Sequence, residues 1–136
     1  MERVTLKKVI LVTGGAGFIG SNLCEYLSKV HEYKVFSIDD YSTGTPKNHV
    51  TGVEYIDCST HDIDKVIKFT PDIVYHLGEY SRVEQSFLDI ETVLKSNFMG
   101  TFKVLEFCSK KDTKLIYAAS STKFGDNRIG KKQSTY

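Results

Sequence analysis

Three glycines near the N-terminus stand at a spacing that suits the binding of phosphate groups. Gly14, Gly17 and Gly20 lie in the segment TGGAGFIG, between a short β-branched run and a stretch with helical periodicity. The first would permit a tight turn, the second would let the backbone approach a pyrophosphate, and the third would let a helix pack closely on a strand. A helix N-terminus there adds free N–H groups and a positive dipole end. The pattern predicts a dinucleotide site, and the alternative is a glycine-rich turn without a ligand.

A carboxylate follows at the distance that such a site requires. Asp39 ends the next apolar run, 19 positions after Gly20, where it can accept hydrogen bonds from both hydroxyls of an adenosine ribose. A 2′-phosphate would be repelled by Asp39 and Asp40, and no Arg lies in the glycine segment or just after Asp40. These residues favour NAD over NADP. Asp40 itself fits a loop-capping residue better than a second ribose ligand.

The elements that position these residues alternate along the chain. Apolar runs predict strands at 8–12, 34–39, 53–56, 72–77 and 114–120, and helical spacing predicts helices at 20–29 and 59–69, with Ser59 and Asp62 as a capping box. A long helix from 81 to 111 should carry along one face Val93, Leu94, Asn97, Phe98, Thr101, Val104, Leu105 and Cys108. Alternating strands and helices predict an α/β fold with a doubly wound parallel sheet, Rossmann-like, as one domain over residues 1–136 that is incomplete after the fifth strand.

Composition limits the partners that we expect. The net charge of the 136 residues is +1, with no cluster of lysines, which favours a small-molecule partner over nucleic acid or an anionic membrane. Cys24, Cys58 and Cys108 are far apart, have no metal-ligand spacing and are typical of buried free thiols, so no metal is expected. The first apolar run ends at Gly14, too short for a membrane span, and no small-residue cleavage site follows it. A cytoplasmic location is therefore expected.

Six segments together resemble a known family. TGGAGFIG, SIDDYSTG, YIDCS, VYHLGE, SNFMGT and YAASSTKFGD occur in the order and spacing of extended short-chain dehydrogenases/reductases. The resemblance is to the NAD-dependent sugar epimerase/dehydratase family, which includes UDP-glucose 4-epimerase, and it covers essentially the whole chain. It implies a nucleotide-sugar substrate, a UDP- or dTDP-sugar, and a reaction through a keto-sugar.

The resemblance also assigns residues to the cofactor. It places Asp57 and Cys58 beside the adenine, and Asn97 as a brace for the active-site backbone. The full set of cofactor-binding residues that it implies is Gly14, Gly17, Phe18, Ile19, Gly20, Asp39, Asp40, Ser42, Thr43, Gly44, Asp57, Cys58, Leu77, Gly78, Glu79 and Asn97.

The catalytic residues follow from the same resemblance. Ser120 would be the catalytic Ser/Thr that orients the substrate oxygen, and Tyr136, at the end of QSTY, would be the catalytic tyrosine. The substrate-binding residues would be Ser81, Ser121 and Thr122. In the family a tyrosinate takes the hydroxyl proton while NAD takes the hydride, and a Lys four positions after the tyrosine lowers the pKa of that tyrosine. That Lys is absent from this sequence, so we expect NAD binding with little or no turnover.

Two residues after the fourth strand allow more than one interpretation. Glu79 stands where relatives usually have a small residue, and it could tune the cofactor or turn to solvent. We expect the second, because a buried Glu is rare unless it is paired. His76 ends a buried strand and is expected to be a packed core residue rather than a catalytic one.

Several functions remain open. Dehydratases of the family carry Asp-Glu directly after the catalytic Thr, whereas Ser121 and Thr122 stand here, which favours an epimerase. The chain is thus expected to be the NAD-binding portion of a nucleotide-sugar epimerase. The alternatives are a non-catalytic dinucleotide-binding module or half of a split enzyme, and an NAD-dependent sugar 4,6-dehydratase or reductase. In the family the long helix belongs to a dimer bundle, so a homodimer or a completing chain is an expected partner.

Overall fold

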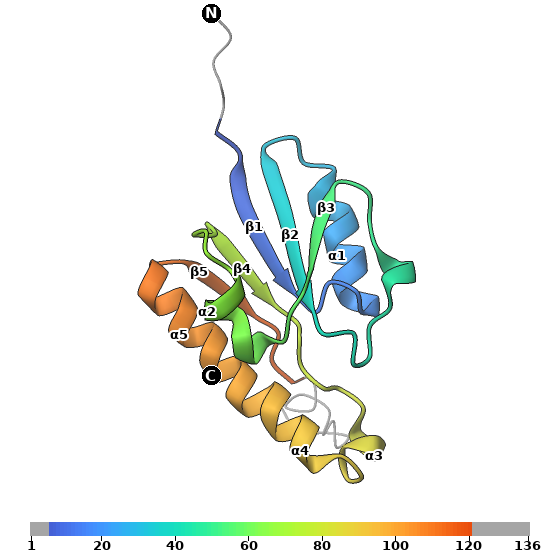
Figure 1. Cartoon of the computed structure of the whole chain (residues 1–136). Coiled ribbons are helices and arrows are strands. Elements are labelled where there is room, and N and C mark those ends of the chain that lie inside the picture. Colours follow the sequence, from blue (N-terminus) through green and yellow to red (C-terminus); the bar gives the residue numbers. More distant parts are fainter. Residues whose placement is uncertain (1–5, 121–136) are drawn as a thin grey trace, which may run out of the picture.

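A five-stranded parallel sheet forms the centre of the protein (Figure 1). The computed structural model describes residues 6–120. The strands are β1 (Lys8–Thr13), β2 (Tyr33–Asp39), β3 (Val53–Asp57), β4 (Ile73–His76) and β5 (Lys114–Tyr117). Their order is β3-β2-β1-β4-β5, and every neighbouring pair is parallel. The predicted α/β fold is confirmed, and the sheet changes direction of winding at β1, where ligands bind in such folds.

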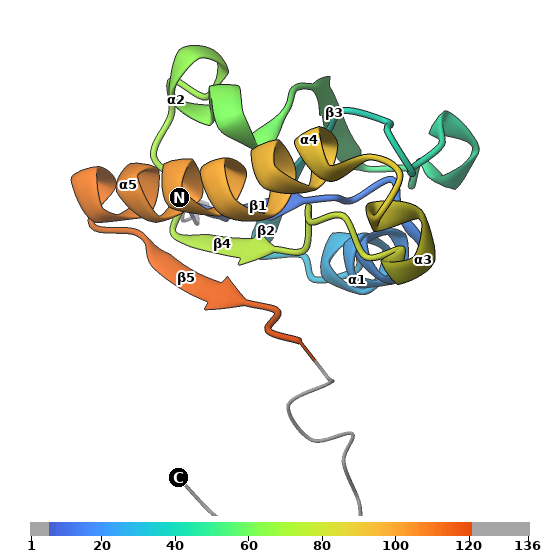
Figure 2. The same cartoon turned by 90° about the horizontal axis from the view of Figure 1, so that it is seen from below.

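Helices cover both faces of this sheet (Figure 2). The helix α1 (Phe18–Ser28) lies on one face, and α2 (Ile63–Val66) and α5 (Thr101–Lys111) lie on the other. Between β4 and α5 the chain forms α3 (Val83–Ser86), α4 (Ile90–Val93) and a π-helix (Leu94–Gly100). Two 3₁₀ turns occupy Pro46–Asn48 and Thr60–Asp62.

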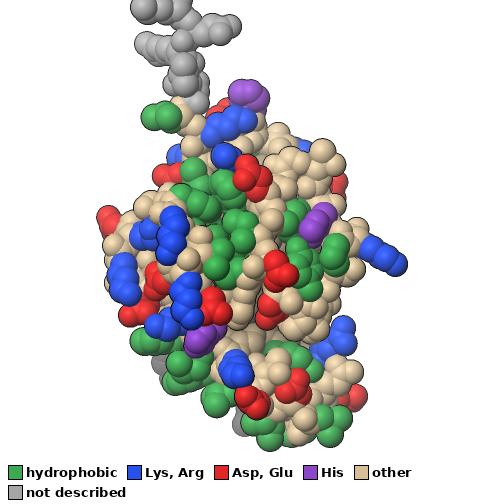
Figure 3. Space-filling view, in the orientation of Figure 1, with side chains coloured by type: hydrophobic (Ala, Val, Ile, Leu, Met, Phe, Trp, Pro, Cys, Tyr) green, Lys and Arg blue, Asp and Glu red, His purple; other side chains and the backbone are tan. Residues whose placement is uncertain are grey.

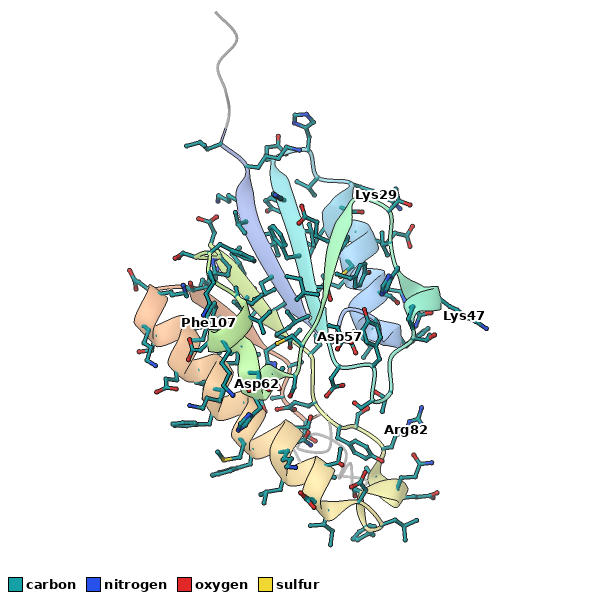
Figure 4. The ribbon with its side chains drawn as sticks, viewed as in Figure 1. Lys29, Lys47, Asp57, Asp62, Arg82 and Phe107 are labelled. Carbon is teal, nitrogen blue, oxygen red and sulfur yellow. The ribbon has the colours of Figure 1, made fainter. Side chains whose placement is uncertain are left out.

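The β-branched runs of the central strands bury alternate residues on the two faces of the sheet. One cluster packs against α1 and contains Ile10, Val12, Val35, Cys24 and Leu27. The other packs against α2 and α5 and contains Leu11, Phe36, Ile38, Cys58, Ile63, Ile67, Val74, Val104, Phe107 and Cys108. Phe107, its largest wholly buried side chain, belongs to α5 and is labelled in Figure 4. All three cysteines are free and buried, as predicted.

The predicted long helix is wrong in its start, and its predicted face is buried only in part, at Val104 and Cys108. The segment Val83–Ser86 is a separate turn, and the helix that reaches Lys111 starts at Ile90. Within it the π-helix holds an extra residue per turn, which rotates the following residues relative to a regular α-helix. Leu94, Phe98 and Leu105 are therefore more than half exposed, while Phe107, absent from the predicted face, is buried.

The short helix after β3 is also shorter than predicted. The Ser59 hydroxyl caps its first turn by accepting from the His61 backbone N–H at 3.3 Å. Asp62 does not complete a capping box, because its carboxylate accepts from the Lys65 ammonium at 2.6 Å. The backbone becomes extended at Ile67, so the helix ends at Val66 rather than at residue 69.

Exposed apolar side chains gather along the helix that contains α4 and α5. They include Ile90, Leu94, Phe98, Phe102 and Leu105. Figure 3 shows hydrophobic side chains at the lower edge of this face of the molecule, where Figure 1 places that helix. Within residues 6–120, no helix is both long enough and apolar enough to cross a membrane.

Candidate functional site

The glycine segment makes a turn whose conformation excludes larger residues at two of its three predicted positions. Gly14 has a positive φ of 77°, and a Cβ there would lie 2.9 Å from the backbone of Gly78. A Cβ on Gly20 would overlap the carbonyl oxygen of Gly14. A Cβ on Gly17 would meet only that same oxygen, at 3.4 Å, an ordinary contact. The fold requires Gly14 and Gly20, whereas Gly17 leaves open space in front of the turn.

The N-terminus of α1 faces this space with its backbone donors. Gly17 is the N-cap and supplies no side chain, and the first turn contains no acidic residue. The side chains of Phe18 and Ile19 are largely exposed. The first N–H groups of a helix have no partner within it, and the helix dipole makes this end positive. The arrangement fits a bound anion such as a pyrophosphate.

Asp39 joins the glycine segment to the turn after β2. One carboxylate oxygen accepts from the Ala16 N–H at 2.8 Å, and the other accepts from the Tyr41 N–H at 2.9 Å. The residue is almost wholly buried, yet each oxygen has a second lone pair for a ligand hydroxyl. Asp40 instead accepts from the N–H and the hydroxyl of Ser42, at 3.0 and 2.6 Å, and so caps the loop as predicted.

The loop after Asp40 is tied to the same turn, which was not foreseen. The Thr45 N–H and the Asn48 side-chain amide both donate to the carbonyl oxygen of Ala16, at 3.1 and 2.8 Å. His49 stacks on Tyr55 with ring centroids 3.8 Å apart. The two bonds to Ala16 fix the loop against the glycine segment, next to the position of Asp39, and the stacked rings join its end to β3.

Asn97 braces the backbone after β4, as predicted. Its carbonyl oxygen accepts from the Tyr80 N–H at 2.6 Å, and its amide donates to the Tyr80 carbonyl at 2.9 Å. The neighbouring Ser96 hydroxyl donates to the Gly78 carbonyl at 3.4 Å. The π-helix that carries both side chains therefore holds the segment 78–80 in place.

A chain of hydrogen bonds starts at Thr13 and runs beneath this segment. The Thr13 hydroxyl accepts from the Leu77 and Gly78 N–H groups, at 3.1 and 2.9 Å, and lies 2.7 Å from His76 Nδ1. Because its oxygen already accepts twice, its proton points to Nδ1, and His76 Nε2–H donates to the Thr101 hydroxyl at 2.9 Å. Burial lowers the pKa of His76, against the opposing effect of Glu79, which favours this neutral ring. His76 is a wholly buried core residue, as predicted.

Glu79 ends this chain, and the prediction that it turns to solvent is wrong. Its Oε1 accepts from the Thr101 hydroxyl at 2.7 Å and from the Tyr117 hydroxyl at 2.9 Å, and it lies 3.8 Å from His76 Nε2. Two hydroxyl donors compensate for the loss of water around the carboxylate. The hydrogen bond to Glu79 and burial raise the pKa of Tyr117, so this tyrosine keeps its proton and is unsuited to act as a base.

These features surround one cavity of about 930 Å³ at the carboxyl ends of the strands. The predicted residues that line it are Gly14, Gly17, Phe18, Ile19, Gly20, Asp39, Asp40, Ser42, Thr43, Cys58, Leu77, Gly78, Glu79, Ser81, Asn97 and Ser120. Gly44 and Asp57 do not line it. Gly44 packs behind Asp39, where a Cβ would lie 2.9 Å from a carboxylate oxygen, and Asp57 pairs with Asp39 across β2 and β3. Ser121, Thr122 and Tyr136 lie outside the described residues.

Further residues line the cavity that sequence reasoning did not assign to the site. They are Ile38, Thr60, Tyr80, Arg82, Val83, Ser86, Val93, Ser96, Tyr117, Ala118 and Ala119. Tyr80 and Arg82 lie in the loop after β4, and Ala118 and Ala119 directly follow β5, so for these four the position after a strand end was the available signal. Arg82, which Figure 4 shows on the segment leading into α3, is the only Lys or Arg among the described residues of the lining. Within the part of the chain that the structure describes, no group of His, Cys, Asp or Glu is arranged to hold a metal ion.

Comparison with known proteins agrees with this geometry. Residues 10–136 match the family described as "NAD dependent epimerase/dehydratase family". The chain belongs to this family. Members of the family are NAD-dependent, and the glycine turn, the open end of α1 and Asp39 fit the pyrophosphate and ribose of that cofactor.

Similar proteins include sugar-nucleotide enzymes of two kinds. UDP-glucuronic acid decarboxylase 1 of Danio rerio is 30% identical over 132 residues, which cover 96% of this chain and 31% of the relative. UDP-N-acetylglucosamine 4-epimerase of Methanobrevibacter ruminantium superposes with a TM-score of 0.79 at 28% identity, over 95% of this chain and 43% of that structure. The NAD complex of UDP-glucose 4-epimerase from Thermus thermophilus gives 0.73 at 31% identity, over 82% and 37%. This chain thus spans less than half the length of these relatives.

Proposed function

We propose that this chain is the NAD-binding part of a nucleotide-sugar epimerase. The observation that carries the proposal is the single cavity that joins the glycine turn and Asp39 at one end to Glu79 and Ser120 at the other. An extended dinucleotide needs such a continuous cavity across the switch point of the sheet. The similarity to 4-epimerases, one of them solved with NAD, supports this assignment.

The residues divide the work of such a site. NAD, when bound, would accept a hydride from a sugar carbinol and return it to the resulting ketone. The backbone donors of the α1 N-terminus would hold the pyrophosphate, and Asp39 would accept from the ribose hydroxyls. Ser120 would orient the substrate oxygen, and Tyr136 would take and return the hydroxyl proton. The absence of an Asp-Glu pair after Ser120 favours epimerisation over dehydration.

Decarboxylation of a nucleotide uronic acid is the second candidate. The similarity to UDP-glucuronic acid decarboxylases favours it. Arg82 supplies a cation on the cavity wall with which the carboxylate of a uronate would pair. The two candidates share the cofactor and the oxidation step, and they differ in the substrate.

Binding of the cofactor is the first test. Calorimetric titration of the 136-residue chain should show NAD binding with a clear preference over NADP, because a 2′-phosphate would lie beside Asp39 and Asp40. Absence of binding to either dinucleotide would refute the proposal. Equal affinity for the two would refute the role of the carboxylates.

Product analysis is the second test. With NAD present, conversion of UDP-glucose to UDP-galactose supports the epimerase, and release of carbon dioxide from UDP-glucuronate supports the decarboxylase. NAD binding without either product is the result that we expect for this chain, and it fits the NAD-binding portion of an epimerase as well as the dinucleotide-binding module. The homodimer expected from the resemblance is a separate proposal, which sedimentation analysis tests. The exposed Leu94, Phe98, Phe102 and Leu105 provide a face of the helix on which a second copy would pack.

A further inference from the structure

Glu79 lies at the end of the cavity opposite to Asp39. The strand order places β2, which ends in Asp39, on one side of β1, and β4 and β5 on the other side. If Asp39 holds the adenosine ribose and the α1 N-terminus holds the pyrophosphate, the second half of the dinucleotide must extend over the ends of β4 and β5. Glu79, Tyr117 and Ser120 line the cavity at that end. The nicotinamide half therefore belongs beside Glu79.

The charge of Glu79 is not neutralised by its neighbours. The Thr101 and Tyr117 hydroxyls stabilise and orient the carboxylate, but neither carries a positive charge. His76, 3.8 Å away, is wholly buried and has neutral hydroxyl partners on both ring nitrogens. Among residues 6–120, no Lys or Arg forms an ion pair with Glu79, and the Arg82 guanidinium donates to Gln85 at 3.4 Å. Glu79 thus brings a net negative charge to the cavity wall.

We propose that Glu79 makes this site prefer oxidised NAD⁺ to reduced NADH, an inference that rests on the proposed NAD-binding function. The nicotinamide ring is positively charged in NAD⁺ and neutral in NADH, so a fixed carboxylate beside it attracts only the oxidised form. At the effective dielectric constant of a half-buried site, the expected preference from this charge is about tenfold.

This preference suits a reaction that takes a hydride and then returns it. A site that binds NAD⁺ more tightly than NADH makes the reduced cofactor a better hydride donor. The hydride removed from the sugar is thereby driven back to the keto-sugar, and both electrons return to the substrate. The hydrogen-bonded chain Thr13–His76–Thr101 fixes the position of the Glu79 carboxylate, because each group in it donates a hydrogen bond to the next.

The test compares the affinities of the two oxidation states. The chain contains no Trp, so NADH fluorescence reports NADH binding directly, and displacement by NAD⁺ gives the second dissociation constant. Glu79→Gln keeps the shape of the side chain and removes its charge. Glu79→Ala removes both the charge and most of the side chain. Tyr117→Phe is the matched control, because it breaks a hydrogen bond to Glu79 and keeps the charge. Thermal unfolding verifies that each protein is folded.

The expected result is a change in the ratio of the two affinities. Each Glu79 variant that folds should lower the preference for NAD⁺ over NADH about tenfold, and Tyr117→Phe should leave the ratio within about twofold of the original. Equal weakening of both oxidation states in the Glu79 variants would show a merely structural role and overturn the inference. An equally large change in ratio for Tyr117→Phe would also overturn it. If the unaltered chain binds neither form, the proposed function itself fails, which is a different outcome from an unchanged ratio.

Discussion

Substitution of Gly17 by Ala should separate cofactor binding from folding. The backbone at Gly17 has φ −80° and ψ 177°, which any residue adopts. A Cβ there would meet only the Gly14 carbonyl oxygen, at 3.4 Å. The methyl group would nevertheless stand at the N-cap of α1, where the backbone donors face the cavity. The protein should therefore tolerate the change, while a pyrophosphate should not.

The magnitudes can be estimated from the local geometry. Ala is a poorer N-cap than Gly by about 0.5–1 kcal/mol, and a Gly-to-Ala change recovers about 0.4–1 kcal/mol by restricting the unfolded chain. The two contributions nearly cancel, so Tm should shift by no more than about 4 °C. Each charge-assisted hydrogen bond to the pyrophosphate contributes about 1.5–3 kcal/mol. Displacement of the phosphates from one such donor should weaken NAD binding by about 10- to 100-fold.

The assay pairs thermal unfolding with NAD titration, and Gly20→Ala is the matched control. A Cβ on Gly20 would overlap the Gly14 oxygen and lie 2.7 Å from the Gly14 carbonyl carbon, so α1 would have to move. An overlap this close with the backbone should cost about 3 kcal/mol, the upper end of the usual range for overpacking, and Tm should fall by about 10 °C. The reasoning is refuted if Gly17→Ala binds NAD as tightly as the original chain. It is refuted equally if Gly17→Ala lowers Tm as much as Gly20→Ala does.

Three further outcomes concern buried groups. Burial lowers the pKa of His76, so below about pH 6.5 the unfolded chain binds a proton at this residue more readily than the folded chain does. The stability of the fold should therefore decrease as the pH is lowered below that value. His76→Asn should make Tm less dependent on pH in this range. Burial raises the pKa of Cys24, Cys58 and Cys108 to about 11, so between about pH 9 and 11 these thiols lose their protons in the unfolded chain before they do in the folded one. Urea unfolding should therefore show that stability falls as the pH rises through this range, by about 3 kcal/mol per thiol. Cys108→Ala should remove one such contribution. Asn97→Leu leaves the Tyr80 N–H and carbonyl without their partner. Urea unfolding should show that the free energy of unfolding falls by about 2 kcal/mol. No such fall is expected if solvent replaces the amide.

The sheet and the glycine turn could be predicted because their signals are local. A run such as KVILV buries both faces of a central strand, and its own composition shows this. Gly14 and Gly20 likewise exclude a Cβ through contacts within a few residues or with the adjacent strand end. The position of Asp39 followed from its place at the end of β2, and the observed strand starts one residue before its predicted start and ends at Asp39, as predicted.

The helix before β5 could not be predicted as well, because its periodicity is not constant. A π-turn shifts the buried face by about one residue, and a regular 3.6-residue pattern does not continue through it. The exposed Leu94 and Phe98 also have the apolar character of core residues, so composition cannot distinguish a face that packs on the sheet from one that does not. Asn97 indicated the correct face, since a polar side chain among apolar neighbours needs specific partners.

Glu79 shows how a sound general rule fails when the partners are distant in sequence. The rule that a buried Glu is rare unless it is paired is correct, but the hydroxyls that satisfy Glu79 come from residues 22 and 38 positions later. Both were within reach of a topological argument. Tyr117 lies opposite His76 in the parallel register of β4 and β5, and Thr101 is one turn after Asn97, which already points to the segment after β4. Strand register and helix face, taken together, identify the partners of a polar residue that neither pattern identifies alone.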